Sequence, residues 1–533
     1  MNNKEISAIV SLYAKLAELH GEDSFRTKSY SNAAFQINKS QEPLTSYDEQ
    51  EWLSMPGFGK GIVPKLMSLT STGTFPQLDN YLENTPKGVL AMLRIKGLGA
   101  KKLLIVWKEM GIETVGELLY ACKENRLKDV KGFGIKTQAS ILQQIEFMYA
   151  NADKFHYATA EAEAMKILAE LKALPGCTHA STCGPLRRKE IILDKIDFLY
   201  AGDKSPLEKW AQNRPQDENV KFPIGIHHCE DKDFVAELIQ RTGNKEFLES
   251  IGFEFKEYKT EEDFFKEKKR NYLPPECRHG REYEKDVDAS KLIEYRDLKG
   301  VLHNHSTYSD GLHSLEEMAS FVKENGFEYF AISDHSKAAF YANGLSEDRI
   351  IEQHREIDLL NAKMKGFKTY KSIEADILNN GDLDYDKETL NSFDFVIASV
   401  HSNLKMDKEK AHARLIKAIE NPHTRILGHL TTRLLLAREG YPVDHNYIID
   451  ACAENGVCIE LNANPYRLDI DWQWIPYCMR KDVLISINPD AHNKDGIFDM
   501  KYGTYAARKG LLTKDMCLNA LSLEDFEKWV NNK

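Results

Sequence analysis

The chain lacks the features that would place it in a membrane or in an oxidising compartment. No apolar run in its 533 residues approaches the roughly 18 residues that a membrane-spanning helix requires. Its nine cysteines include no C-x-x-C pair, and their odd number, spread from Cys122 to Cys517, does not fit a disulfide framework or a zinc ribbon. The first residues combine acidic side chains with a helical apolar rhythm, which predicts a helix and not a signal peptide. We therefore expect a cytoplasmic protein with no membrane contact.

The chain also lacks the net positive charge of a protein that binds nucleic acid over its whole surface. Its formal net charge is −11. Residues 1–150 carry 18 Lys and Arg against 16 Asp and Glu, so the acidic excess lies in the remainder, with 53 against 66. Any contact with DNA should therefore be local and sensitive to salt.

What the sequence does contain is a glycine turn that occurs three times in the first 150 residues. The segments MPGFGKG, IKGLGAKK and VKGFGIK each place an apolar residue between two glycines, and their first glycines are 40 and 35 residues apart. A single Gly-x-Gly often only ends a helix, but three copies followed by lysines predict helix-hairpin-helix units. Glycine allows a close backbone approach, and the next helix directs its free N–H groups at a DNA phosphate. The predicted DNA-binding residues are Gly57, Gly59, Lys60, Gly97, Gly99, Lys101, Lys102, Gly132, Gly134 and Lys136.

Together with EDSFRTKSYSNAAFQI around Phe25, the order of these turns resembles the amino-terminal and fingers domains of bacterial family X DNA polymerases. In relatives, a lysine one helical turn past the first glycine turn forms a Schiff base with a 5′ deoxyribose phosphate. Lys65 falls at the matching position, so the resemblance implies a lyase nucleophile there, provided that its amine loses a proton easily. The alternative is an ordinary helix lysine in contact with water.

Residues 150–285 resemble the palm and thumb of the same family, but the polymerase carboxylates are missing. The segment CGPLRRKEIILDKIDFLYAGD, from Cys183, resembles the palm motif. The resemblance places Asp197 at the second metal aspartate, Lys195 at the first, and Gly225 near the third. Two-metal phosphoryl transfer requires several carboxylates around two cations, so we expect polymerase activity to be weak or lost.

From Leu298 the sequence alternates short apolar segments with amphipathic helices, which predicts a parallel β/α barrel. The expected strands lie near 300–303, 328–333, 368–373, 393–399, 424–428, 456–461 and 483–488. Active sites of such barrels gather at the carboxyl ends of the strands. Imidazole and carboxylate groups follow six of these strands and are typical ligands of zinc, manganese or iron. The predicted metal ligands are His303, His305, Asp310, His335, Glu374, His401, His429, Asp490 and His492.

This set of ligands resembles that of the polymerase and histidinol phosphatase (PHP) domain over residues 297–533. The resemblance implies two or three divalent metal ions. One would be held by His303, His305, Glu374 and Asp490, a second by Glu374, His401 and His429, and a third by Asp310, His335 and His492. From the residues alone, Asp334 could support a neighbouring ligand, and Arg433 could bind a phosphate with both arms of its guanidinium or simply lie on a helix surface.

The sequence therefore predicts a multidomain α+β and α/β protein with four parts. These are a helical domain with a helix-hairpin-helix unit (1–85), a fingers-like helix-hairpin-helix region (86–150), a degenerate family X palm and thumb (151–285), and a seven-stranded PHP metallo-phosphoesterase barrel (286–533).

The favoured function is a metal-dependent DNA phosphoesterase of DNA repair, with 3′-to-5′ exonuclease activity and with 3′-phosphatase and abasic-site cleavage as related reactions. Its expected partner is a gapped, nicked or 3′-ended duplex, bound by a monomer. Two alternatives stay open: a small-molecule phosphatase of the histidinol phosphatase type, and a noncatalytic DNA-binding scaffold.

Overall fold

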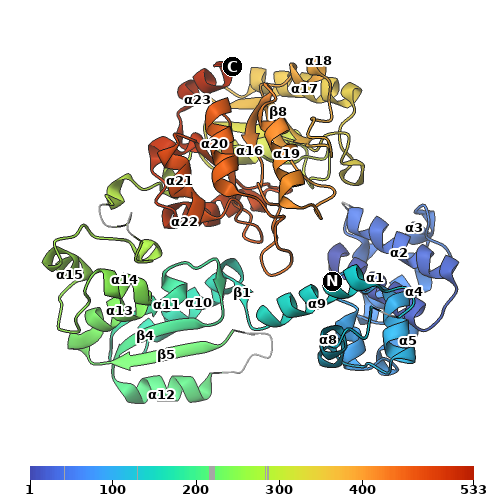
Figure 1. The fold of residues 1–533 in the computed structure, drawn as a ribbon, viewed down its shortest axis with the longest axis horizontal. Coiled ribbons are helices and arrows are strands. Elements are labelled where there is room, and N and C mark those ends of the chain that lie inside the picture. The colour runs from blue at the N-terminus through green and yellow to red at the C-terminus, as the bar shows by residue number, and fades with distance from the viewer. Residues whose placement is uncertain (41, 129, 215–221, 282–283, 285–286, 533) are drawn as a thin grey trace. The chain divides into compact units, whose positions relative to one another are not determined.

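The computed structural model describes residues 1–533 except 41, 129, 215–221, 282–283, 285–286 and 533 (Figure 1). The chain divides into two compact units, residues Met1–Ala152 and Asp153–Lys533. The domain boundary expected between residues 285 and 286 lies outside the described residues. No helix in the described part of the chain is long and apolar enough to cross a membrane.

The first unit is helical and has one apolar core, in which Trp52, Leu66 and Leu118 are fully buried. Its first helix begins with a capping box in which Asn2 and Glu5 each accept a backbone N–H of the other residue. The helices are α1 (Asn3–Leu19), α2 (Ser24–Lys39), α3 (Glu49–Ser54), α4 (Val63–Thr72), α5 (Pro76–Glu83), α6 (Lys87–Met92), α7 (Ala100–Leu104) with the π-helical turn η2 (Ile105–Glu109), α8 (Val115–Lys123) and α9 (Ile135–Ala150).

The second unit begins with a small mixed sheet flanked by helices. Its strand order is β2-β4-β5, with β2 antiparallel and β5 parallel to the central strand. The strands are β2 (Cys177–Cys183), β4 (Ile196–Gly202) and β5 (Ile224–Cys229), and a two-residue pair joins β1 (Phe155–His156) to β3 (Ile192–Leu193). The helices are α10 (Tyr157–Lys172), α11 (Gly184–Arg187), α12 (Lys204–Asn213), α13 (Phe234–Thr242), α14 (Lys245–Ser250) and α15 (Glu261–Glu267).

The remainder of the second unit is a parallel barrel. Within the described residues, its seven strands follow one another in the sheet in chain order. They are β6 (Gly300–Val301), β7 (Tyr329–Ile332), β8 (Lys368–Asp376), β9 (Phe395–Ser399), β10 (Thr424–Leu427), β11 (Cys458–Asn462) and β12 (Ile485–Asn488). The helices are α16 (Leu315–Glu324), α17 (Glu347–Lys363), α18 (Lys387–Leu390), α19 (Lys408–Ile419), α20 (His445–Asn455), α21 (Ile475–Arg480), α22 (Met500–Lys509) and α23 (Leu523–Asn531).

The barrel is nearly closed and one of its ends is filled. Asn304, just past β6, forms a parallel bridge to Ala491, just past β12, which brings the first and last strands together. At the amino ends of the strands, Phe526 of α23 stacks on Tyr329 with ring centroids 4.3 Å apart. Side chains alternate along a strand, so Glu374 shares the inner face of β8 with buried Tyr370. The open end of the barrel is therefore the carboxyl end, and the predicted fold class is confirmed.

Candidate metal centre

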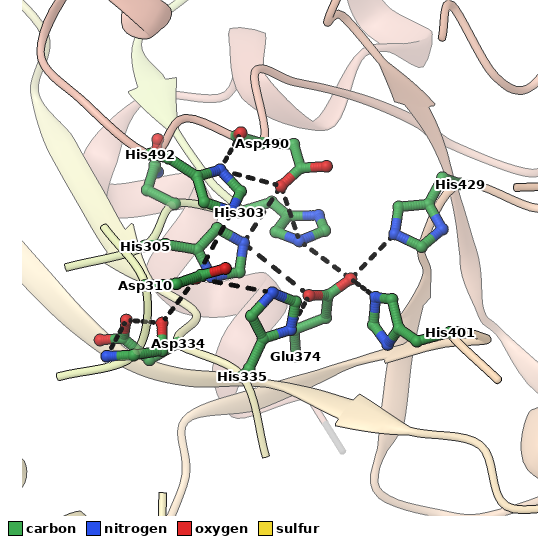
Figure 2. Close-up of polar contacts among 12 residues, drawn as sticks. His303, His305, Asp310, Asp334, His335, Glu374, His401, His429, Asp490 and His492 are labelled. Atoms are coloured by element: carbon green, nitrogen blue, oxygen red, sulfur yellow. Dashed lines mark hydrogen bonds and ion pairs between the residues drawn. The ribbon is translucent and has the colours of Figure 1, made fainter. Parts of the chain in front are cut away.

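Nine side chains from six strands meet at the carboxyl end of the barrel (Figure 2). Glu374 lies within β8, and the others follow their strands or stand in the loop after β6. His303 and Asp490 adopt positive φ angles of 54° and 51°, a strained conformation for residues other than glycine that is common at functional sites. The nine are those that the sequence singles out: His303, His305, Asp310, His335, Glu374, His401, His429, Asp490 and His492.

Glu374 is the centre of the cluster. One carboxylate oxygen, Oε1, lies 2.9 Å from His429 Nε2, 3.0 Å from His401 Nε2 and 3.3 Å from His303 Nε2. The other oxygen, Oε2, lies 2.9 Å from His335 Nδ1 and 3.8 Å from His305 Nε2. A carboxylate whose two oxygens face two different sets of imidazoles is arranged to bridge two cations.

Two further carboxylates, those of Asp490 and Asp310, belong to the cluster, and the first of them lies against His305. Its Nε2 is 3.1 Å from Asp490 Oδ1, while Asp310 Oδ1 is 3.5 Å from His492 Nε2 and 3.7 Å from His335 Nε2. The Asp310 and His492 side chains are each 37% exposed, whereas His303, His305 and Glu374 are buried. The cluster therefore opens to solvent on the side of Asp310 and His492.

The donor atoms form three groups, each compact enough for one ion, and their membership differs in part from the sets that the sequence resemblance implies. His305 and His335 are each close to two groups, so the assignment of ligands to individual ions stays a prediction. The groups are His303, His305 and Asp490; His335, Glu374 and His401; and His305, Asp310, His335 and His492.

Several of these atoms are close together without being hydrogen-bonded. His303 Nε2, His335 Nδ1 and Glu374 Oε2 are buried and have no hydrogen-bond partner among the described residues, although ion-pair distances join them. Burying unpaired polar atoms is costly. A divalent cation would remove this cost, so the residues present fit such ions.

The charges within the cluster agree with this arrangement. Burial alone would raise the pKa of Glu374, but His401 and His303 hold it well below its usual range, so the group is a carboxylate. Burial alone would lower the pKa of His401, but Glu374 and the hydrogen bond to Asp376 raise it to about 10. The charges of Glu374 and its imidazoles thus depend on one another.

Two carboxylates that the sequence analysis missed fix the orientation of two histidines. Glu460 Oε2 lies 2.6 Å from His303 Nδ1, and Asp376 Oδ1 lies 3.1 Å from His401 Nδ1. In each histidine the other ring nitrogen, Nε2, faces Glu374. A carboxylate behind a ligand histidine sets its tautomer and raises its basicity. The available signal was a carboxylate inside an otherwise apolar strand, as in CIELN.

Asp334 and Arg433 occupy supporting positions. Asp334 accepts hydrogen bonds from the backbone and hydroxyl of both Ser306 and Ser309, which fixes the loop that carries Asp310. Arg433 donates to Asp471 (Nη1–Oδ2 2.6 Å) and to the carbonyls of residues 467 and 468. These contacts use the guanidinium edges that a phosphate would need, so phosphate binding by Arg433 stays a prediction that requires displacement of Asp471.

A different arginine stands beside the cluster. The Nε of Arg467 is 3.7 Å from Asp490 Oδ2, and its Nη1 is buried without a hydrogen-bond partner among the described residues. The sequence does not single out this residue, because it lies in the irregular segment after β11, several residues past the strand end.

The mixed sheet carries the polymerase-like aspartate in an altered setting. Asp197 on β4 pairs in register with Gly225 on β5. Its Oδ2 lies 3.0 Å from Lys195 Nζ and its Oδ1 lies 3.2 Å from His227 Nε2. Both oxygens of the remaining aspartate therefore face side chains of the protein.

The three glycine turns of the first unit share the conformation of their first glycine and one hydrogen bond. Gly57, Gly97 and Gly132 have φ angles of 88°, 92° and 90°, which glycine adopts without strain. In each turn, the residue between the glycines donates its N–H to the carbonyl three residues before it, at 3.0–3.2 Å. Lys60, Lys101 and Lys136 beyond the turns are exposed, and Lys102 is half-buried. The structure thus presents three similar turns, each followed by a helix.

Lys65 lies beyond the first turn on α4, half-buried between two tyrosines. Its Nζ donates to the carbonyl of Gly61 at 2.8 Å and stands 5.7 Å from the ring centroid of Tyr30 and 5.9 Å from that of Tyr13. Burial lowers the pKa of Lys65 below its ordinary value, although Glu22 opposes the shift. This is the direction that a nucleophilic amine requires.

Comparison with known proteins agrees with this architecture. A helix-hairpin-helix domain model matches residues 1–75, a SAM-like helix-hairpin-helix tandem matches 89–146, and a PHP domain matches 302–464. Two proteins named as probable phosphatases, from Acetivibrio thermocellus and Caldicellulosiruptor saccharolyticus, are 28% and 27% identical to the chain. They align with 43% and 38% of it and with 94% and 82% of their own lengths.

A longer match covers both units. The DNA polymerase/3′-5′ exonuclease PolX of Bacillus subtilis is 32% identical over 99% of this chain and 99% of its own length. With helix-hairpin-helix and PHP models matching the same chain, this identity along the whole of both proteins shows that the chain belongs to the PolX family.

Proposed function

We propose that this PolX family member hydrolyses phosphodiester bonds at the 3′ ends of DNA, as a 3′-to-5′ exonuclease in repair. The observation that carries the proposal is the Glu374 cluster, in which His303 Nε2, His335 Nδ1 and Glu374 Oε2 are buried without a hydrogen-bond partner among the described residues. The PHP match, over residues 302–464, covers seven of the nine residues, and the name of the Bacillus subtilis relative includes the same exonuclease activity.

The nine residues would hold two or three divalent ions, with manganese, zinc and iron all suited to imidazole and carboxylate ligands. Such ions neutralise phosphate oxygens, generate hydroxide near neutral pH and stabilise the leaving alkoxide. The chain's own groups prepare the site. Glu460 and Asp376 hold two histidines in one tautomer, and Asp334 holds the loop of Asp310.

Arg467 supplies a positive group for the substrate in this proposal. Its Nη1 has no hydrogen-bond partner among the described residues, and its Nε is 3.7 Å from Asp490. We propose that Arg467 binds the nonbridging oxygens of the scissile phosphate, because a guanidinium can donate two parallel N–H groups to such oxygens.

The first unit would hold the DNA. Three turns whose first glycines share one conformation, each followed by a helix and lysines, are suited to phosphates and carry no sequence preference. The substrate that suits both units is a gapped, nicked or 3′-ended duplex. One chain contains both the turns and the nine residues, so the reaction needs no second subunit and a monomer suffices.

Polymerase activity should be weak or lost in this member. Lys195 and His227 occupy both oxygens of Asp197, and Gly225 offers no carboxylate at the adjacent position. A pair of catalytic cations about 3.5–4 Å apart needs several shared carboxylates, which this sheet does not offer.

The test is incubation of end-labelled gapped, nicked, 3′-phosphorylated and abasic duplexes with manganese, with and without dNTPs. We expect shortening from the 3′ end that is independent of dNTPs and absent in His303→Ala and Asp490→Asn. Shortening that persists in both variants would refute the proposed site, and robust templated extension would refute the loss of polymerase activity.

The matches to proteins named as probable phosphatases support a second candidate, a small-molecule phosphatase. Competition separates the two candidates. If DNA ends do not inhibit hydrolysis of a small phosphate ester, the two units do not act on one substrate.

A further inference from the structure

Two adjacent aromatic residues stand exposed at the edge of the candidate metal centre. Phe340 is 84% exposed and Tyr341 is 46% exposed, in the short helical turn η8 (Phe340–Ala342) after β7. A single exposed aromatic residue is ordinary on a protein surface. Two in sequence at the opening of a buried polar cluster call for a specific explanation.

The turn lies directly beside the proposed ligands. The Tyr341 ring centroid is 6.4 Å from that of His335, and the Phe340 ring is 6.0 Å from that of Tyr341. Leu312, which is 49% exposed, stands two residues past Asp310 and donates its N–H to the carbonyl of His492. Aromatic and apolar side chains therefore stand beside His335, Asp310 and His492, and the last two are the residues on the open side of the cluster.

The aromatic pair is held in place, because its loop is tied at several points. Leu345 donates to the carbonyl of His335 at 2.8 Å and Gly344 donates to that of Ala339 at 3.1 Å. A side chain at Gly344 would collide with the carbonyl of Ser336, so the loop closes tightly. Ala339 and Ala342 are buried on either side of the pair. The loop thus keeps its alanines inside and its aromatic rings outside, which pre-organises the rings for a ligand.

We propose that Phe340 and Tyr341 form the binding site for the nucleobase of the 3′-terminal nucleotide. This proposal rests on the proposed exonuclease function. In a nucleotide, one sugar joins the base to its phosphate. If the phosphate lies at the nine residues, the base of the same nucleotide therefore lies at the edge of the cluster. Aromatic side chains bind any base by stacking, which suits an enzyme that removes nucleotides of every sequence.

The terminal nucleotide is the one that needs this site. The glycine turns of the first unit are suited to the phosphates of the duplex, and the nine residues would hold a phosphate of the last nucleotide, so neither holds its base. A stacked terminal base would keep the scissile phosphate beside Arg467 and the nine residues during hydrolysis.

The experiment compares substrates with and without the terminal base. Manganese-dependent removal of a normal 3′ nucleotide and of a 3′ abasic analogue is measured for wild type, Phe340→Ala and Tyr341→Ala. Stacking is worth about 1–3 kcal/mol per base. We therefore expect kcat/KM to fall roughly 5- to 150-fold in the alanine variants on the normal end and to stay within about twofold on the abasic end.

Matched controls keep the aromatic ring or remove a distant one. Phe340→Tyr and Tyr341→Phe should stay close to wild type, because the stacking surface remains. Phe255→Ala removes a phenylalanine that is 50% exposed in the first part of the second unit and should leave the ratio between the two substrates unchanged.

A binding measurement provides a second readout. In EDTA, 2-aminopurine at the 3′ terminus should lose fluorescence on binding to wild type and much less on binding to Phe340→Ala. The same probe at the penultimate position is the control. Equal losses of activity on normal and abasic ends, or quenching that survives removal of both rings, would overturn the proposal. If wild type shortens no DNA while hydrolysing a small phosphate ester, the exonuclease function fails instead.

Discussion

Replacing Glu460 by glutamine tests whether the carboxylate behind His303 tunes the metal centre. Glu460 is fully buried and accepts four hydrogen bonds. Its Oε2 accepts from His303 Nδ1 at 2.6 Å and from Asn488 Nδ2 at 2.9 Å, and its Oε1 accepts from the His429 N–H at 3.1 Å and from Asn462 Nδ2 at 3.0 Å. Every partner is a donor.

Glutamine has nearly the same shape but only one accepting oxygen. In either orientation, its NH2 group faces two donors, and two buried hydrogen bonds are lost. If the NH2 group faces His303, the tautomer of the His303 ring is no longer fixed. Loss of such a carboxylate typically lowers metal affinity 10- to 100-fold, which corresponds to about 1.4–2.8 kcal/mol. We expect Glu460→Gln to weaken binding of the tightest ion by that factor and to lower exonuclease activity at limiting manganese.

The assay is competition with a chelator, followed at fixed pH together with the exonuclease rate at limiting and saturating manganese. Glu388→Gln removes an exposed carboxylate of α18 and should change neither value. Circular dichroism of the metal-free proteins shows whether the variant folds, and Asp376→Asn tests the same reasoning at His401 if it does not. Metal affinity within twofold of wild type in a folded Glu460→Gln protein would refute the argument.

Three further results are expected. Because burial lowers the pKa of Lys65, borohydride trapping on 5′ deoxyribose phosphate DNA should become efficient below the pH at which an ordinary lysine loses its proton. Lys65→Ala should abolish the trapping, whereas Lys39→Ala should not. The absence of an adduct in wild type would exclude a lyase. Gly97→Ala forces a side chain into positive φ, at a cost of about 1–2 kcal/mol in stability, and should weaken DNA binding. Gly366→Ala places a side chain at positive φ in the barrel and should only lower stability. Equal DNA affinity in the two variants would count against a role of the turn in DNA binding. Wild type should not extend a primer on gapped DNA with magnesium or manganese.

The sequence predicts the barrel and its nine residues well because each signal is local. A short apolar segment identifies a strand, and all seven expected strands occur in the described structure. The polar residue that follows the strand must then lie at the carboxyl end of the barrel, because all the strands run in the same direction. The PolX resemblance is equally accessible, because it depends on runs such as the three Gly-x-Gly turns.

Contacts made by irregular segments could not be predicted in this way. Arg433 and Arg467 both follow barrel strands, and nothing in the sequence shows which guanidinium faces Asp490 and which pairs with Asp471. Glu460 was missed for a different reason. It lies inside a strand, where alternation puts it on the inner face, and only the tertiary structure shows that His303 stands against it.

The same chain contains two carboxylate sites whose surroundings differ in one respect that leads us to expect cations at only one of them. At Asp197 the partners are Lys195, a permanent cation at 3.0 Å, and His227, and any metal would have to displace that ammonium group. At Glu374 the five neighbours are imidazoles, which become neutral ligands once they release a proton. Metal binding at Glu374 thus exchanges protons for ions, whereas at Asp197 it must break an ion pair. From this difference we expect the hydrolytic chemistry of the chain to lie in its barrel.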